Sequence, residues 1–218
     1  MTVIVVNKSG SPVSNLDIAL PNAAAVPHLR LTAQQMATTF LSPGEEAKLL
    51  VAIDCMRPYV DCPDFDVSFT LTGRPHRYAL RLPLAPCAFF DPAVCDKATY
   101  MQRWNALGPE CEVKDVFACF RAVDAVFMNQ VRSNLSTVLH IGLAQELDVP
   151  DGNTVTGCCS FRTGTVGADG VAIAVGAMMR LEADMAGGRF RITVRSKNAQ
   201  VAQALKAAFM QQLEGPKA

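Results

Sequence analysis

The sequence predicts two subdomains: a β-sandwich over residues 1–88, followed over residues 89–218 by an α+β platform in which helices flank an antiparallel sheet. Three observations lead to this prediction. Short stretches in which apolar and polar residues alternate, separated by Pro/Gly turns, fill the first part. Prolines then interrupt the chain at Pro83, Pro86 and Pro92. Beyond them helical and strand patterns occur together, which is typical of an α+β unit.

Strand patterns in the first part occur over residues 2–6, 16–20, 47–53, 65–71 and 78–82. The clearest is 65–71, where Phe65, Val67 and Phe69 alternate with polar residues. A turn at 72–75 leads to 78–82, whose apolar residues return on the same face. Several short strands with polar outer faces indicate an immunoglobulin-like sandwich.

The second part opens with a predicted helix that begins at Asp96 as its N-cap and ends at Gly108-Pro109. One helical stripe carries its large apolar side chains: Tyr100, Met101, Trp104 and Leu107. Further apolar residues at helical spacing predict another helical turn or two: Val113, Val116, Phe117 and Phe120.

Strands are then expected over residues 137–143, 154–161, 171–182 and 189–195, the last two forming a hairpin across 183–188. A loop is expected over 160–170. The strongest helical pattern closes the chain, with apolar residues every four positions from Val201 to Leu213. Ser196 or Asn198 is expected to cap its start, and Gly215-Pro216 to stop it.

The composition indicates a soluble, folded, intracellular domain. Half of the residues are apolar and 18% are charged. The 20 basic and 20 acidic residues cancel, so no overall field favours nucleic acid or an anionic membrane. The apolar run at residues 1–6 is too short for a signal peptide, and no stretch reaches the roughly 20 apolar residues of a membrane span.

The sequence contains no signature of an enzyme. There is no G-x-S-x-G, H-E-x-x-H, P-loop or G-x-G-x-x-G motif. The eight cysteines show no C-x-x-C spacing and the three histidines are isolated, so we expect free thiols and neither metal nor cofactor. The alternative from a different class is an enzyme in which a cysteine nucleophile pairs with His140.

Arginines collect on one face of the predicted hairpin. Alternation places Arg180 and Glu182 on the same face of one strand, and Arg189, Arg191 and Arg195 on the same face of the next. Such a surface is either a solvated outer face or a site for an acidic ligand, since guanidinium groups hold carboxylates through paired hydrogen bonds.

The single tryptophan, Trp104, has two interpretations. On an apolar helical stripe it is a core residue. Its neighbour Arg103 and its place near the junction of the two parts also suit a half-exposed aromatic platform, because tryptophan and arginine are enriched at binding hot spots.

Four motifs follow one another in the second part, the first of them in two pieces. FFDP at 89–92 is followed after seven residues by YMQRW at 100–104, then by EVKDVF at 112–117, MMRLEAD at 178–184 and RFRITVRS at 189–196. They resemble FFxP…FFQRW, EVQxIF, LLRLEPN and YRLTLRTS of the appendage (ear) domain of α-adaptin, the large subunit of the plasma-membrane clathrin adaptor. The resemblance covers about residues 83–214, and VAIDC at 51–55 with Asn7-Lys8 extends it loosely into the sandwich.

The resemblance implies a non-catalytic platform that recruits endocytic accessory proteins at clathrin-coated pits, on the cytosolic face of the plasma membrane. Its ligands are short Asp-Pro-Phe, Asp-Pro-Trp and FxDxF peptides in disordered partners, and the missing trunk joins it to the rest of the adaptor complex. Carried over by position, Trp104 is the pocket floor, Arg180 and Arg191 contact the anion, and Glu182 and Gln102 lie at the rim. Met101 replaces the second phenylalanine of the FFQRW motif.

Two departures from the family pattern accompany the substitution at Met101. The family's second site, on the sandwich, uses a phenylalanine where this chain has Val5 and Val6, so we do not expect that site here. The loop over 160–170 is longer than the resemblance implies. Besides the cysteine enzyme, the alternatives are the appendage of a β-type adaptor subunit and a spacer without a site, the latter favoured if Trp104 is fully buried.

Overall fold

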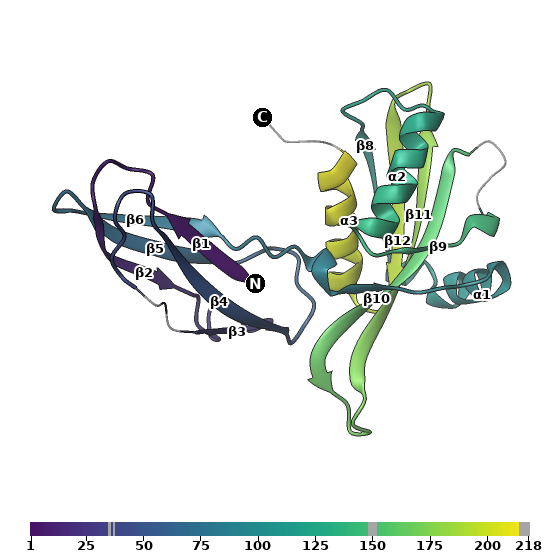
Figure 1. The fold of residues 1–218 in the computed structure, drawn as a ribbon. Coiled ribbons are helices and arrows are strands. Elements are labelled where there is room, and N and C mark those ends of the chain that lie inside the picture. The colour runs from purple at the N-terminus through teal and green to yellow at the C-terminus, as the bar shows by residue number, and fades with distance from the viewer. Residues whose placement is uncertain (35, 37, 148–151, 214–218) are drawn as a thin grey trace. The chain divides into compact units, whose positions relative to one another are not determined.

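The structure is a computed structural model that describes residues 1–218 apart from 35, 37, 148–151 and 214–218, and apart from the side chain of residue 145. The chain forms two compact units (Figure 1). The first comprises Met1–Arg57 and Cys62–Leu84, and the second comprises Pro58–Asp61 and the chain from Ala85 onward. Within the described residues no helix is long and apolar enough to cross a membrane.

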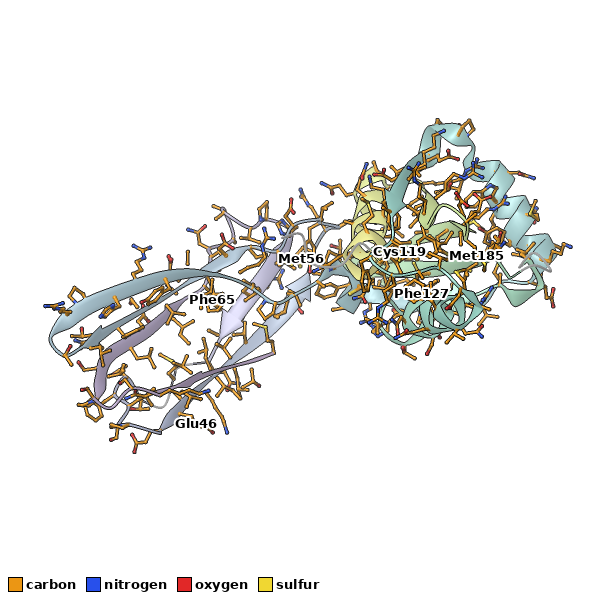
Figure 2. The ribbon with its side chains drawn as sticks, turned by 90° about the horizontal axis from the view of Figure 1, so that it is seen from above. Glu46, Met56, Phe65, Cys119, Phe127 and Met185 are labelled. Atoms are coloured by element: carbon orange, nitrogen blue, oxygen red, sulfur yellow. The ribbon has the colours of Figure 1, made fainter. Side chains whose placement is uncertain are left out.

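The first unit is a β-sandwich, as predicted. One sheet has the order β1-β4-β3 and the other β2-β5-β6, and all neighbours are antiparallel. The strands are β1 (Thr2–Val6), β2 (Val13–Ala19), β3 (Leu29–Ala33), β4 (Glu46–Cys55), β5 (Asp64–Leu71) and β6 (Arg74–Arg81). Alternate residues of these strands fill its core, among them Leu16, Val51 and Phe65 (Figure 2).

The second unit is an antiparallel sheet with the order β7-β10-β11-β12-β8, and β9 pairs with β10. Its strands are β7 (Phe90–Pro92), β8 (Glu112–Ala118), β9 (Gly142–Leu143), β10 (Thr154–Val166), β11 (Ala172–Asp184) and β12 (Arg189–Ser196). Its helices are α1 (Lys97–Leu107), α2 (Ala125–Thr137) and α3 (Ala199–Leu213), with short 3-10 turns η1 (Pro86–Phe89), η2 (Pro109–Cys111) and η3 (Gln145–Leu147). The predicted α+β platform is therefore present.

The two faces of this sheet are covered differently, with α1 and α3 on opposite sides (Figure 1). On one face, the fully buried residues of β12 pack beneath the fully buried residues of α3, which are Val201, Leu205 and Phe209. Asn198 caps α3 by accepting hydrogen bonds from the backbone N–H groups of Gln200 and Val201. On the other face lies α1, where the Tyr100 hydroxyl donates to the Met179 carbonyl oxygen at 2.8 Å.

The helical turn predicted from the spacing of Val113 to Phe120 is wrong, because this stretch forms strand β8. β8 pairs with β12, and Phe117 stacks on Phe190 in the buried layer with ring centroids 5.9 Å apart. Val116 points to the opposite face and is exposed. Because Val116 is apolar although it is exposed, the apolar residues of this strand do not alternate, and their spacing resembles that of a helix.

The strand predicted over 137–143 is also wrong except for its end, since only Gly142–Leu143 pairs with β10. Helix α2 ends at Thr137 instead, after beginning at Asp124, whose side chain accepts a hydrogen bond from Phe127 N. Residues between the helix and β9 turn the chain, with His140 at a φ of 53°.

The loop predicted over 160–170 is shorter in the structure, because β10 continues to Val166. The Thr163 hydroxyl donates to the Ile173 carbonyl oxygen across this extension of the β10–β11 hairpin. Only the turn around Gly170, whose φ is 78°, remains outside the strands. The helix stop predicted at Gly215-Pro216 lies outside the described residues.

Candidate functional site

Helix α1 is fixed at both ends and along its inner side. The Asp96 carboxylate accepts a hydrogen bond from Thr99 N, and Gly108 ends the helix with a φ of 66°, which favours glycine. Tyr100 is buried among residues of β10 and β11, and burial raises the pKa of its hydroxyl. These contacts place the next turn of the helix over β12.

The Trp104 ring lies between two side chains. It stacks on Tyr100 with ring centroids 5.6 Å apart and an interplanar angle of 14°. The guanidinium carbon of Arg195 lies 4.4 Å from the Trp104 ring centroid. Trp104 is only partly buried, so the condition that favoured a spacer without a site is not met.

Beyond α1 the sheet face is open. The register places six side chains on this part: Lys114, Val116, Arg180, Glu182, Arg191 and Thr193. We call it the open face. Lys114 and Val116 come from β8, which the sequence did not identify as a strand, so no periodicity argument could have placed them here.

Two arginines hold one carboxylate at the centre of the open face. Glu182 and Arg191 are register partners, and Arg191 donates to Glu182 Oε2 at 2.7 Å from Nε. Arg180 Nη2 lies 3.0 Å from Glu182 Oε1. The hydrogen bond from Arg191 is the main cause that lowers the pKa of Glu182, the charges of both arginines add to it, and partial burial opposes it.

The charge of the open face is positive. Arg180 and Arg191 carry two positive charges against the one negative charge of Glu182, and Lys114 beside them lies 3.7 Å from Glu112. Both arginine side chains remain about half exposed, at 46% and 59%. They can therefore turn part of their donors towards a ligand while still bound to Glu182. Trp104 supplies an aromatic surface on the same face of the sheet. The positive charge together with this ring suits an acidic ligand that also has an apolar side chain.

Arg195 has a different role from the one its alternation pattern indicated. Its guanidinium donates to Glu112 Oε2 at 2.8 and 3.0 Å and to the Trp104 carbonyl oxygen at 2.7 Å. Both Arg195 and Glu112 are mostly buried at the edge of α1. Arg195 thus positions the tryptophan and is not available to a ligand.

Of the predicted site residues, Met101 and Gln102 lie at different places on α1. Met101 is 43% exposed and neighbours Trp104 around the helix, at the side where Lys97 and Glu146 line a shallow depression. Gln102 is two residues from both Tyr100 and Trp104, which face the sheet. At 100° per residue it projects from the opposite side of the helix, away from the open face. The structure therefore joins Arg180, Glu182 and Arg191 on the open face, places Trp104 on the helix that lies on the same face of the sheet, and leaves Gln102 apart.

Three of the buried cysteines do not have the low pKa of a nucleophile. Burial raises the pKa of Cys55 to about 11 and that of Cys158 to about 12, and it also raises the pKa of Cys159. These thiols are therefore neutral at pH 7, whereas the thiolate is the nucleophile. His140 hydrogen-bonds through Nδ1 to the Phe90 carbonyl oxygen. Among the described residues no group of acidic, cysteine or histidine side chains could hold a metal ion.

The fold and the open face together define an appendage-type domain, a β-sandwich followed by a platform with an exposed aromatic and basic surface. Comparison with known proteins agrees. The family described as "Alpha adaptin AP2, C-terminal domain" matches residues 88–213, which is more than half of the chain. The chain belongs to the α-adaptin family, as a divergent appendage domain.

Two curated relatives match almost the whole chain. AP-2 complex subunit alpha-2 of Dictyostelium discoideum is 24% identical over 209 residues, and AP-2 complex subunit alpha of Schizosaccharomyces pombe is 25% identical over 210 residues. Each alignment covers 95% of this chain but only 20% and 22% of the relative. The chain thus spans about a fifth of the length of these relatives, and both are α subunits and not β-type subunits.

Proposed function

We propose that this domain recruits accessory proteins in clathrin-mediated endocytosis by binding Asp-Pro-Phe, Asp-Pro-Trp and FxDxF peptides at the open face. One observation carries the proposal: a partly exposed tryptophan lies on the same face of the sheet as two half-exposed arginines that share one glutamate. The aromatic side chain of the peptide packs against Trp104, and its aspartate pairs with Arg180 and Arg191. Met101 contributes an adaptable apolar edge to the aromatic pocket.

The expected affinity is modest. Burying one phenylalanine side chain stabilises the complex by about 2 kcal/mol, and each hydrogen bond to a charged group by about 1.5–3 kcal/mol. Ordering a flexible peptide costs a large part of this gain. The dissociation constant is therefore expected to be micromolar, and repeated motifs in one partner strengthen recruitment by avidity.

The names of the relatives support a proposed place of action. Both are named as subunits of the AP-2 complex, and each is about five times as long as the aligned segment. We place this domain at the cytosolic face of the plasma membrane, in clathrin-coated pits, attached through a trunk to the rest of an adaptor complex. Disordered accessory proteins then reach it without entering the membrane.

The test is a calorimetric titration of the folded domain with one FxDxF peptide and one Asp-Pro-Phe peptide. The wild type should bind with micromolar affinity, and quenching or shift of Trp104 fluorescence should follow the same curve. Trp104→Ala, Arg180→Ala and Arg191→Ala should each weaken binding at least tenfold. Arg30→Ala, an exposed arginine on β3 of the sandwich, serves as the control and should not change it. Failure of the folded wild type to bind either peptide overturns the proposal.

A further inference from the structure

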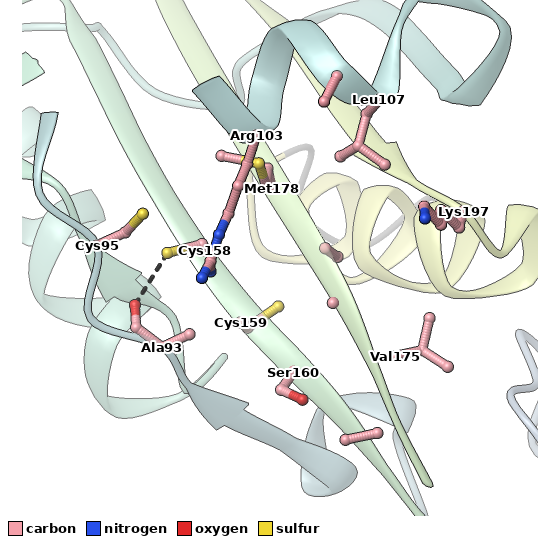
Figure 3. A pocket seen from close by; sticks show the side chains of 14 residues that line it. Ala93, Cys95, Arg103, Leu107, Cys158, Cys159, Ser160, Val175, Met178 and Lys197 are labelled. Atoms are coloured by element: carbon pink, nitrogen blue, oxygen red, sulfur yellow. Dashed lines mark hydrogen bonds between the residues drawn. The ribbon is translucent and has the colours of Figure 1, made fainter. Parts of the chain in front are cut away.

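A pocket of about 640 Å³ lies on the other flank of α1, on the same face of the sheet as the open face (Figure 3). Its floor is the middle of β10 and β11, and its walls come from α1, the segment after β7 and the residue after β12. Most of its lining is small or apolar, including Ala93, Ala106, Leu107, Ala174 and Met178. The pocket volume is typical of ligand sites. None of the predicted peptide-site residues lines this pocket, that is, none of Met101, Gln102, Trp104, Arg180, Glu182 and Arg191.

Gly176 in the pocket floor has no backbone reason to be glycine. It pairs with Ser160 inside an unbroken register from Glu182 to Ala174, and its φ is not positive. A Cβ atom built on it meets no atom within 4 Å. Glycine weakens a strand and often marks a place where a ligand or another backbone approaches closely. The space above Gly176 is thus a candidate position for a ligand side chain.

Two cations line the pocket without a protein partner. Arg103 reaches from α1 towards Cys158, and Lys197 stands at the far side of the floor (Figure 3). Across the described part of the chain, no hydrogen bond or ion pair holds either side chain. The Asp96 carboxylate interacts only weakly with Arg103: the hydrogen bond from Thr99 N is the main cause that lowers the Asp96 pKa, and the charge of Arg103 is the smallest. The pocket therefore suits an anionic group.

Cys158 contributes an uncharged wall. Its thiol donates to the Ala93 carbonyl oxygen at 2.9 Å, and burial together with neighbouring Cys95 raises its pKa. Because the thiol stays neutral at pH 7, it does not compete for Arg103 as an anion. The positive charge of the pocket is left for a ligand.

A free strand edge borders the pocket. β11 pairs with β12 only from Ala177 onward, where Ala177 is opposite Ser196. Among the described strands, none pairs with residues 172–175 of β11 on that side. Lys197 follows directly after the last paired residue of β12. An extended peptide can hydrogen-bond along such an edge, which a fatty acid or a small carboxylic acid cannot do.

We infer that this pocket is a second peptide site, which binds an extended segment carrying acidic residues two positions before and after an aliphatic side chain. The aliphatic side chain lies over Gly176, and its backbone follows the free edge of β11. Because alternate residues of an extended peptide share a face, the carboxylates two positions to either side point into the same pocket and pair with Arg103 and Lys197. This site is separate from the open face and does not depend on the function proposed there.

The test uses the peptide acetyl-Glu-Ser-Leu-Ser-Asp-amide and the isotope-labelled domain, with binding followed by amide chemical shifts. Shift changes are expected at Ala174, Gly176, Met178 and Lys197. The matched peptide with Asn and Gln in place of the acidic residues should bind at least tenfold more weakly. Shifts confined to the residues around Trp104, or no binding at all, overturn the inference.

Variants separate this site from the open face. Gly176→Leu places a side chain in the free space and should abolish peptide binding, and the pair Arg103→Ala with Lys197→Ala should weaken it at least tenfold. Gly10→Leu in the sandwich is the matched control, since a Cβ there also meets no atom within 4 Å. Arg180→Ala should leave binding of this peptide unchanged while weakening FxDxF binding, so the two proposals fail independently.

Two outcomes with folded variants overturn the inference, and circular dichroism and the thermal midpoint establish folding. In the first, Gly176→Leu binds the acidic peptide as tightly as the wild type. In the second, decanoate shifts the pocket amides while the peptide does not, which assigns the pocket to a lipid-like acid instead.

Discussion

The Arg195 guanidinium carbon lies 4.4 Å from the Trp104 ring centroid, and Arg195 Nη1 donates to the carbonyl oxygen of the same tryptophan at 2.7 Å. Glu112 holds the guanidinium from the other strand and neutralises its charge. The tryptophan is thus fixed by both its ring and its backbone. Arg191 and Arg195 lie on the same face of β12 but have different roles. Arg195 positions the tryptophan ring, whereas Arg191 remains exposed.

Replacing Arg195 by methionine should destabilise the second unit and loosen Trp104. The change removes the contact with the ring and three hydrogen bonds, and it leaves the mostly buried Glu112 with only the longer contact to Lys114. We expect a loss of about 1–3 kcal/mol in the free energy of unfolding, measured in urea, and a red shift of Trp104 emission. Arg189→Met, an exposed change on the same strand, should alter neither. Unchanged emission in Arg195→Met would contradict the positioning role.

Replacing Glu182 by glutamine should cost stability only where Glu182 is ionised. Its folded pKa is lowered from 4.5, so the stabilisation is present above that pH and is lost as the pH falls through the lowered value. Because both arginines are about half exposed and screened by solvent, we expect only about 0.5–1 kcal/mol at pH 7. Urea unfolding of both proteins at pH 7, 5 and 3 measures this difference. A difference that grows towards pH 3 would contradict the sign.

Replacing Met101 by phenylalanine restores the residue type of the family motif beside Trp104. An added aromatic contact contributes about 0.5–1.5 kcal/mol, so the affinity for an FxDxF peptide should rise roughly 2- to 10-fold. Gln102→Ala, its neighbour in sequence, projects away from the open face and should leave the affinity unchanged. An equal effect of both changes in calorimetric titrations would refute the placement of these two side chains.

The cap of α1 should matter for binding, and the cap of α2 should not. Asp96→Ala and Asp124→Ala each remove one side-chain cap, and each should cost about 1 kcal/mol in the free energy of unfolding. Only Asp96→Ala loosens the helix that carries Trp104, so only this variant should weaken binding of an FxDxF peptide. Equal peptide affinities in the two variants would argue against a site on α1.

Alkylation with iodoacetamide should leave the buried cysteines of the folded protein unmodified at pH 7. The raised pKa values of Cys55, Cys158 and Cys159 keep them as neutral thiols, and their burial limits access. Mass spectrometry of tryptic peptides after a timed reaction measures this, with the urea-unfolded protein as the control. Rapid selective labelling of one of these residues would contradict this prediction and support the alternative of an enzyme with a cysteine nucleophile.

Helices and strands whose apolar residues all lie on one buried face could be predicted from the sequence. Those with apolar residues on both a buried and an exposed face could not. β5 and α3 bury one face each, so their periods of two and of about four are clear. β8 buries Phe117 but exposes Val116 on the open face, so its apolar residues follow neither face alone. No element was predicted over residues 125–136, where α2 forms, and β-branched residues just beyond its end, including Val138 and Ile141, resemble a strand.

The candidate site was partly predictable for a similar reason. Arg180, Glu182 and Arg191 follow from alternation within one hairpin, because neighbouring strands share a register. The partner of Arg195 could not be found, since Glu112 lies 83 residues away on a strand that the sequence did not indicate. The pocket beside Gly176 requires the crossing of α1 over the sheet, which no local pattern encodes.

A single strand carries both surfaces. Arg180 and Gly176 lie on the same face of β11, four residues or about 13 Å apart, and Met178 between them lies beneath α1. A partner with an aromatic motif and an acidic-aliphatic motif in one disordered tail must pass over this helix, which is about 10 Å across. A flexible spacer of about ten residues spans roughly 17 Å and can do so. The width of α1 thereby sets a minimum spacing between the two motifs of a bivalent partner.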